Sequence, residues 1–177
     1  MVSTTVTLVA LIALGGYLLA RTRAGALAGS GDVRLHSLPG YHGVFVALWV
    51  GLPSLLLVLV WLALQGPVID ALLVESLPET LRSGGDGGRI DLLLSEIKSV
   101  ASGRIFGEPE PAVLAAAERY AAWREIARWA MVAAATCVAL LGLALAQRRL
   151  SPAFRARESV ERITTGLMIA CAVLAIV

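Results

Sequence analysis

Long apolar stretches separated by polar segments are the main pattern of this chain. Uncharged runs cover Val6–Ala20 and Val44–Leu64, and a third, largely apolar stretch extends from about 128 to 146. A helix rises about 1.5 Å per residue, so about 20 apolar residues cross the roughly 30 Å hydrocarbon core of a bilayer. The pattern therefore predicts three membrane spans, at about 6–20, 44–64 and 128–146.

The first apolar run has two interpretations. No basic residue precedes it, and Arg21 and Arg23 follow it, whereas a cleaved signal peptide carries its positive charge in front. The small residues of Ala26-Leu27-Ala28 resemble a cleavage site, so removal of this segment stays open as an alternative. We favour a retained span.

The last stretch of the sequence is a basic segment, Arg148–Arg162, that leads into the apolar run Ile163–Val177. This run is shorter than a spanning helix and is still apolar at its last residue. We therefore expect the chain to be the N-terminal part of a longer protein. The predicted domains are a membrane extension, 1–150, and a basic linker with the truncated first helix of a following core, 151–177.

The polar region 65–127 predicts a small helical domain between the second and third spans. One amphipathic helix ends at Gly103, and its apolar face is formed by Ile90, Leu93, Leu94, Ile97, Val100 and Ala101. A second helix begins at Pro111, a favoured first position, and its pattern runs unbroken to Ala146. The predicted fold class is all-α, with polytopic transmembrane helices and this external helical loop.

Three features of the spans carry further expectations. Pro53 predicts a bend in the second span, either as a tolerated kink, which we favour, or as a functional hinge. The small residues of the pairs Ala135–Ala139 and Gly142–Ala146 permit close helix approach. An interfacial aromatic belt is predicted at Tyr120, Trp123 and Trp129.

Composition and charge define the class and the topology. Hydrophobic residues make up 58% of the chain and charged residues only 16%, which excludes an ordinary soluble domain. Basic residues dominate 21–43 and 148–162, while acidic residues dominate 65–126. Since basic flanks stay in the cytoplasm, we expect the N-terminus and 65–126 outside and the two basic segments inside.

The sequence contains no recognisable reactive site. His36 and His42 lack an accompanying cluster of metal ligands, so turn and interface roles near Pro39-Gly40 are favoured over a metal site. The Gly-rich run 83–88 lacks the Lys of a phosphate-binding loop and is interpreted as a linker. Cys137 and Cys171 lie in apolar runs, so no thiol chemistry is expected. We assign no catalytic, cofactor-binding or metal-binding residue and expect no cofactor, and substrate-binding residues stay unassigned.

Three segments carry a family resemblance. Pro152–Val177 resembles the start of the permease core in PstC-type subunits of the bacterial phosphate ABC transporter. Leu35–Trp49 and Glu96–Tyr120 are similar to the N-terminal extension of long versions of that subunit. The coupling loop through which the family contacts its ATPases is not among these residues.

The resemblance implies a role in ATP-driven import of inorganic phosphate across the bacterial inner membrane, in a multi-pass protein. It implies as partners the lipid bilayer, a second permease subunit, cytoplasmic ATPase subunits that hydrolyse ATP, and a periplasmic phosphate-binding protein. No nucleic-acid partner and no enzymatic activity of the chain itself are expected. The alternative from the residues alone is a membrane-tethered sensor with an external helical domain, although Ile163–Val177 stands where a receptor would continue into a soluble domain.

Overall fold

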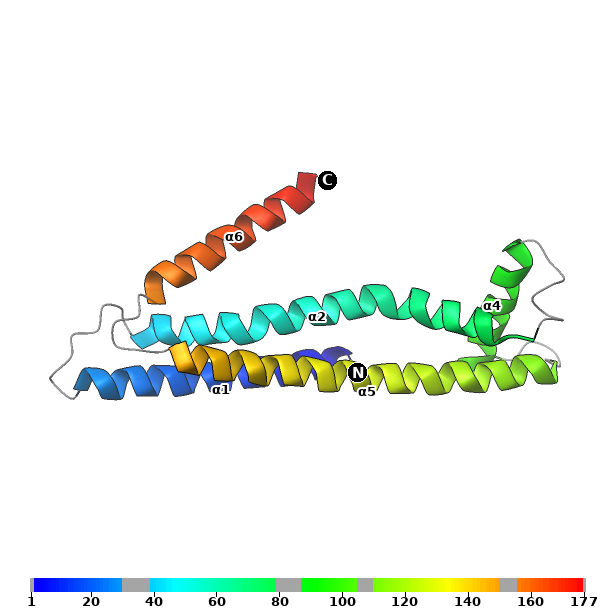
Figure 1. The fold of residues 1–177 in the computed structure, drawn as a ribbon, viewed down its shortest axis with the longest axis horizontal. Coiled ribbons are helices and arrows are strands. Elements are labelled where there is room, and N and C mark those ends of the chain that lie inside the picture. Colours follow the sequence, from blue (N-terminus) through cyan, green and yellow to red (C-terminus); the bar gives the residue numbers. More distant parts are fainter. Residues whose placement is uncertain (1, 30–38, 79–86, 105–109, 150–155, 177) are drawn as a thin grey trace. The chain divides into compact units, whose positions relative to one another are not determined.

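The computed structural model describes residues 2–29, 39–78, 87–104, 110–149 and 156–176 (Figure 1). The helices in this part of the chain are α1 (Val2–Gly29), α2 (Pro39–Ser76), α4 (Gly87–Ala101), α5 (Pro111–Arg149) and α6 (Ala156–Ile176). The described residues form no strand, which confirms the all-α prediction. Helices α1, α2 and α5 are long and apolar enough to cross a membrane.

The three long helices extend well beyond the apolar runs. Helix α1 continues through Arg21 and Arg23 to Gly29, and α2 already begins at Pro39, so the connection predicted over 22–43 is shorter than expected. Ala24 is buried, which shows that packing stabilises this extra turn. Helix α2 also continues past the predicted span to Ser76. The limits of the spans in the bilayer stay predictions.

The chain divides into two compact units, which are described separately. Unit 1 comprises Met1–Val58 and Ala133–Val177, and unit 2 comprises Leu59–Val132. Each unit has its own cluster of buried apolar side chains. The predicted division at residue 150 follows the sequence pattern rather than contacts and stays a prediction.

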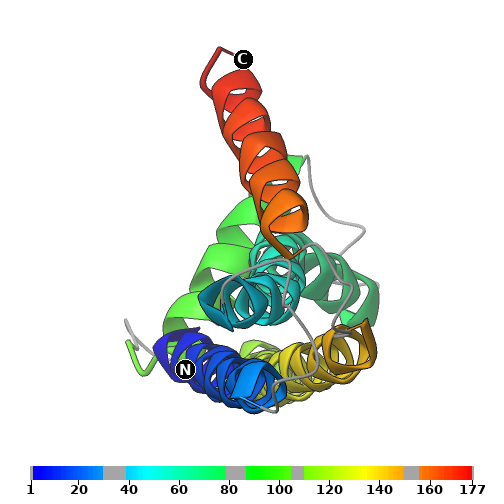
Figure 2. The same ribbon diagram turned by 90° about the vertical axis from the view of Figure 1, so that its left-hand side faces the viewer.

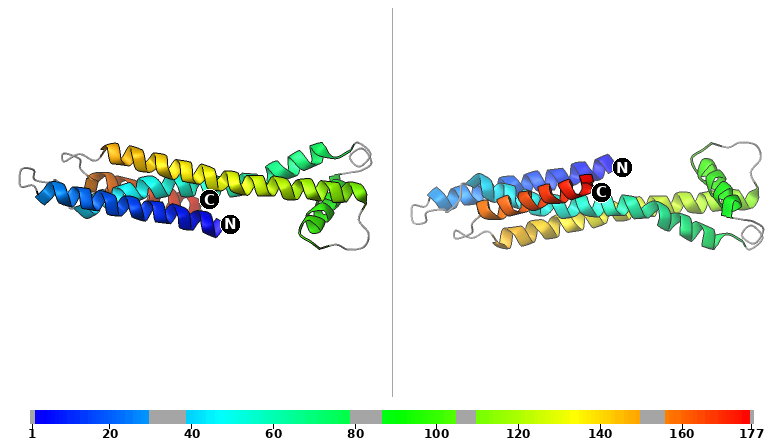
Figure 3. Two further views of the ribbon diagram at one scale, coloured as in Figure 1. Left: turned by 90° about the horizontal axis from the view of Figure 1, so that it is seen from below. Right: turned by 90° about the horizontal axis from the view of Figure 1, so that it is seen from above.

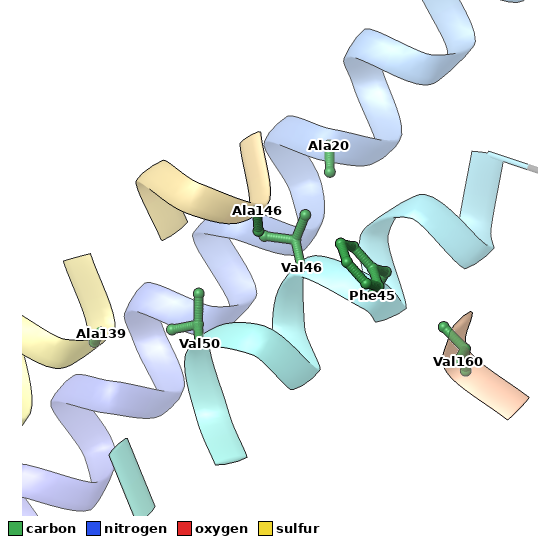
Figure 4. Close-up of a cluster of buried hydrophobic side chains, with 7 residues drawn as sticks. All are labelled: Ala20, Phe45, Val46, Val50, Ala139, Ala146 and Val160. Atoms are coloured by element: carbon green, nitrogen blue, oxygen red, sulfur yellow. The ribbon is translucent and has the colours of Figure 1, made fainter. Parts of the chain in front are cut away.

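Unit 1 is a bundle in which α1, the first part of α2 and the last part of α5 lie side by side (Figure 2). Figure 4 shows the core, where Val46 and Val50 of α2 lie among small side chains of the neighbouring helices. The buried cluster consists of Ala20, Phe45, Val46, Val50, Ala139, Ala146 and Val160. Apolar side chains on three sides of α2 therefore hold the bundle together.

Small residues on α5 allow its close approach to α2. Ala135, Ala139 and Ala146 are completely buried, and Gly142 is buried between them. A Cβ atom on Gly142 would lie 2.6 Å from the backbone oxygen of Trp49, closer than any real contact. The prediction that these small residues permit close helix packing is confirmed.

Polar contacts join the helices of unit 1 near Arg23 of α1 and Arg149 of α5. The Arg149 guanidinium lies over the Trp49 ring, 5.0 Å from its centroid. Arg23 Nη1 donates a hydrogen bond to Gln147 Oε1 at 2.5 Å. These contacts connect α5 with α2 and with α1.

Helix α6 contacts the core of unit 1 only near its start, through Val160 and Ile163. Arg157 Nε donates a hydrogen bond to Glu161 Oε1 at 2.7 Å, and this bond raises the pKa of Arg157. The following side chains are exposed, including Leu167 and Met168. An apolar helix with this much exposed surface needs lipid or further protein around it.

Candidate functional site in unit 2

Unit 2 brings the C-terminal part of α2, the short helix α4 and the N-terminal part of α5 together (Figure 3). Its buried cluster consists of Leu73, Leu77, Ile97, Val113, Ala116 and Ala117. All three helices contribute to this list, so the polar region between the second and third predicted spans has a core of its own.

The amphipathic character of α4 is as predicted. Ile97 is completely buried, and Leu94 and Val100 pack against the core, whereas Leu92 on the opposite side is 73% exposed. The helix ends where Gly103 adopts a φ of 82°, a left-handed conformation that favours glycine. Its backbone N–H donates to the carbonyl of Val100 at 2.9 Å. The predicted helix and its glycine stop are confirmed.

An ion pair connects α4 with α2. Lys98 Nζ lies 2.7 Å from Asp70 Oδ2, with the two side chains 39% and 30% exposed. Pairs with this much solvent contact stabilise a fold by only about 0.2 to 1 kcal/mol. The other carboxylate oxygen of Asp70 is buried and has no hydrogen-bond partner among the described residues. The pair is therefore a contact between α4 and α2 that adds little to stability.

The helix ends in unit 2 are capped by polar contacts. Arg119 Nη1 donates a hydrogen bond to the Ser76 carbonyl at 3.3 Å, at the end of α2. The Glu110 carbonyl accepts bonds from the N–H groups of Val113 and Leu114 at the start of α5. Pro111 occupies the first helical position, as predicted, where its missing N–H costs nothing.

A pocket of about 280 Å³ opens between α2 and α5 within unit 2. Its lining residues are Leu62, Gln65, Gly66, Ile69, Tyr120 and Arg124. The Arg124 guanidinium carbon lies 5.8 Å from the centroid of the Tyr120 ring, a cation–π contact between two lining residues. The pocket thus combines apolar walls with one cation and one amide.

The described histidine and cysteine residues do not form a common site. His42 is buried in the first turns of α2, while His36 lies outside the described residues. Cys137 and Cys171 are free and exposed. No group of three His, Cys, Asp or Glu side chains suited to a metal occurs in the part of the chain that the structure describes.

Two further sequence features have clear positions. Of the Gly-rich run, 83–86 lie outside the described residues, and Gly87 begins α4. Tyr120 and Trp123 pack against the core of unit 2, whereas Trp129 is 59% exposed and donates to Glu125 Oε1 at 3.3 Å. Packing therefore accounts for two of the three aromatic residues, and the interfacial belt stays a prediction.

Comparison with known protein families gives a direct match. Residues 6–104 match a family described as phosphate ATP-binding cassette transporter. This segment is more than half of the chain. The chain belongs to this family. No curated protein and no solved structure matches it.

The match places the structure within the phosphate ATP-binding cassette transporter family and confirms the resemblance seen in the sequence. The matched segment contains most of α1 and all of α2 and α4, and it ends directly after the turn at Gly103. Helix α5 lies beyond it, yet α5 supplies Val113, Ala116 and Ala117 to the core of unit 2. Within unit 2, the last part of the family segment and the first part of α5 therefore share one core.

Sequence patterns did not reveal the polar contacts of unit 2. Asp70 and Lys98 are 28 residues apart, and Arg119 is 43 residues from Ser76. Only the folding of α4 and α5 against α2 brings these groups together. The one available signal was the charge of Asp70 directly after a long uncharged run, which indicates the end of the apolar part of α2.

Proposed function

We propose that this chain is the N-terminal region of a permease subunit that takes part in ATP-driven import of inorganic phosphate across the bacterial inner membrane. The observation that carries the proposal is the family match over 6–104. Three helices suited to cross a membrane support it, as does the resemblance of Pro152–Val177 to the start of a permease core. The family match favours this function over a membrane-tethered sensor.

The residues of the chain indicate which steps of transport belong to other subunits. The sequence has no nucleotide-binding motif, so ATP hydrolysis belongs to separate cytoplasmic ATPase subunits. The predicted spans contain no internal charged residue, so the phosphate path belongs to the permease core formed with a second permease subunit. In this proposal residues 1–177 contribute assembly and docking rather than transport chemistry.

Unit 2 is the part of the chain suited to an external partner. The excess of acidic residues in 65–126, between basic segments, supports an external position for it. The core around Leu73 and Ile97 gives unit 2 a defined shape outside the predicted spans, with Leu92 exposed on α4. We propose that this surface adds contact area for the periplasmic phosphate-binding protein or stabilises the assembled subunit.

Exchange of α4 for a featureless linker tests this role. Residues 79–109 are replaced by a Gly/Ser linker of equal length in the full subunit, and 30–38 are replaced in the same way as a matched control on the opposite side. We expect the first exchange to raise about tenfold the concentration of phosphate-binding protein needed for half-maximal uptake, which corresponds to a loss of about 1.4 kcal/mol. Equal uptake per subunit in both variants would exclude a role for α4.

A further inference from the structure

The pocket between α2 and α5 in unit 2 lies where charge first appears on both helices. On α2 an uncharged stretch ends at Asp70, directly after the lining residue Ile69. On α5 the last charge before the apolar stretch is Arg128, one turn after the lining residue Arg124. In a membrane protein this boundary corresponds to the level of the lipid headgroups.

The polar groups of the pocket suit a phosphate group. Arg124 presents a planar set of N–H donors that matches phosphate oxygens, and its ring contact with Tyr120 orients it. No described carboxylate forms an ion pair with Arg124, so its charge is available to a ligand. Gln65 adds an amide at the same opening.

Asp70 is an acidic group close to the pocket lining, and its charge is compensated. Asp70 follows Gly66 by one helical turn, and its carboxylate would repel an anion. Lys98 Nζ lies 2.7 Å from this carboxylate and balances its charge. Arg124 is therefore a cation of the pocket lining whose charge no described ion pair offsets.

The apolar walls favour a phosphate attached to a hydrocarbon. Leu62 and Ile69 line the pocket, and Leu59, one turn before Leu62 on α2, is 65% exposed. An acyl chain would cover Leu59 and Leu62, which are 65% and 43% exposed. A free phosphate dianion would gain nothing from them and would meet a single cation.

We propose that this pocket binds the phosphate group of a membrane glycerophospholipid, with Arg124 and Gln65 on the phosphate and Leu59 and Leu62 along an acyl chain. The volume of about 280 Å³ is just below the usual range of ligand pockets and suits a headgroup rather than a whole lipid. This site is independent of the phosphate path and of the docking role proposed for α4. Its ligand is structural lipid.

Two variants change the pocket in different ways. Arg124→Gln removes the charge, and Arg128→Gln removes a neighbouring interfacial charge outside the pocket as its control. Gly66→Leu places a larger side chain in the pocket lining, and an added Cβ at this position meets no atom within 4 Å. Gly51→Leu is its control, since Gly51 also has open space and does not line the pocket.

Native mass spectrometry of the protein, titrated with phosphatidylglycerol or phosphatidylethanolamine, measures the site. We expect one tightly bound phospholipid, with binding about tenfold weaker in Arg124→Gln and Gly66→Leu and unchanged in both controls. Diacylglycerol, which lacks the phosphate, should not bind.

Three results would overturn the proposal. Equal lipid binding by Arg124→Gln and Arg128→Gln would show that the pocket cation is not involved. Equal binding of diacylglycerol would show that the phosphate is not recognised. Displacement of the lipid by millimolar inorganic phosphate would show that the pocket takes free phosphate instead.

Discussion

Substitution of Gly142 by alanine should force α2 and α5 apart in unit 1. The added Cβ would lie 2.6 Å from the backbone oxygen of Trp49 and 3.4 Å from the Cα of Val50. An ordinary contact between carbon and oxygen is roughly 3.3 Å, so the helices must separate by about 0.7 Å. Backbone atoms have no rotamer that relieves such a contact.

The matched control is Gly51→Ala on α2, where the added Cβ meets no atom within 4 Å. Both substitutions improve helix propensity by about 1 kcal/mol, so this contribution cancels in the comparison. Overpacking a close contact costs about 1 to 3 kcal/mol. We therefore expect Gly142→Ala to be about 1 to 3 kcal/mol less stable than Gly51→Ala.

Reversible unfolding in mixed micelles with increasing dodecyl sulfate, followed by circular dichroism, measures this difference. Gly142→Leu should lower stability further, since its side chain extends into Val50 as well. If Gly142→Ala were as stable as Gly51→Ala, the close approach of α5 to Trp49 would be wrong.

Three other predictions address separate features. A double-mutant cycle with Asp70→Asn and Lys98→Gln should give a coupling free energy of about 0.2 to 1 kcal/mol, and zero coupling would exclude the ion pair as a link between α2 and α4. Hydrogen exchange in nanodiscs should show protection through Trp123–Trp129, because α5 is one helix, and fast exchange there would mean a break. For the topology, single cysteines are introduced at Ser30, Asp86 or Ser151 in a protein without its native cysteines. An impermeant thiol reagent on intact cells should label the cysteine at Asp86, which we expect outside, but not those at Ser30 or Ser151. Labelling at Ser30 and Ser151 alone would invert the topology.

The helices of this protein were predictable because their signals are local. The uncharged runs, the spacing of Ile97 with its apolar neighbours, Pro111 as a start and Gly103 as a stop each act within a few residues. The extra turns of α1 and α2 were missed because tertiary packing, such as the burial of Ala24 and Leu73, overrides the low helix propensity of Gly and Pro in these segments.

The pocket of unit 2 could not be predicted from the sequence. It needs the relative placement of Gly66 on α2 and Arg124 on α5, which no local pattern encodes. The small residues around Gly142 did predict a close helix contact, but only the structure identifies Trp49 as its partner. Contacts between distant segments depend on the fold rather than on the neighbouring residues.

Phosphate uptake by cells that lack this region tests its role in the transporter. Met1–Arg149 is deleted from the full subunit, with a new start before the permease core, in a strain that depends on this transporter for phosphate at low concentration. We expect reduced uptake of radiolabelled phosphate, through lower subunit abundance or weaker interaction with the phosphate-binding protein. Uptake, abundance and affinity for that protein all at their native values would contradict it.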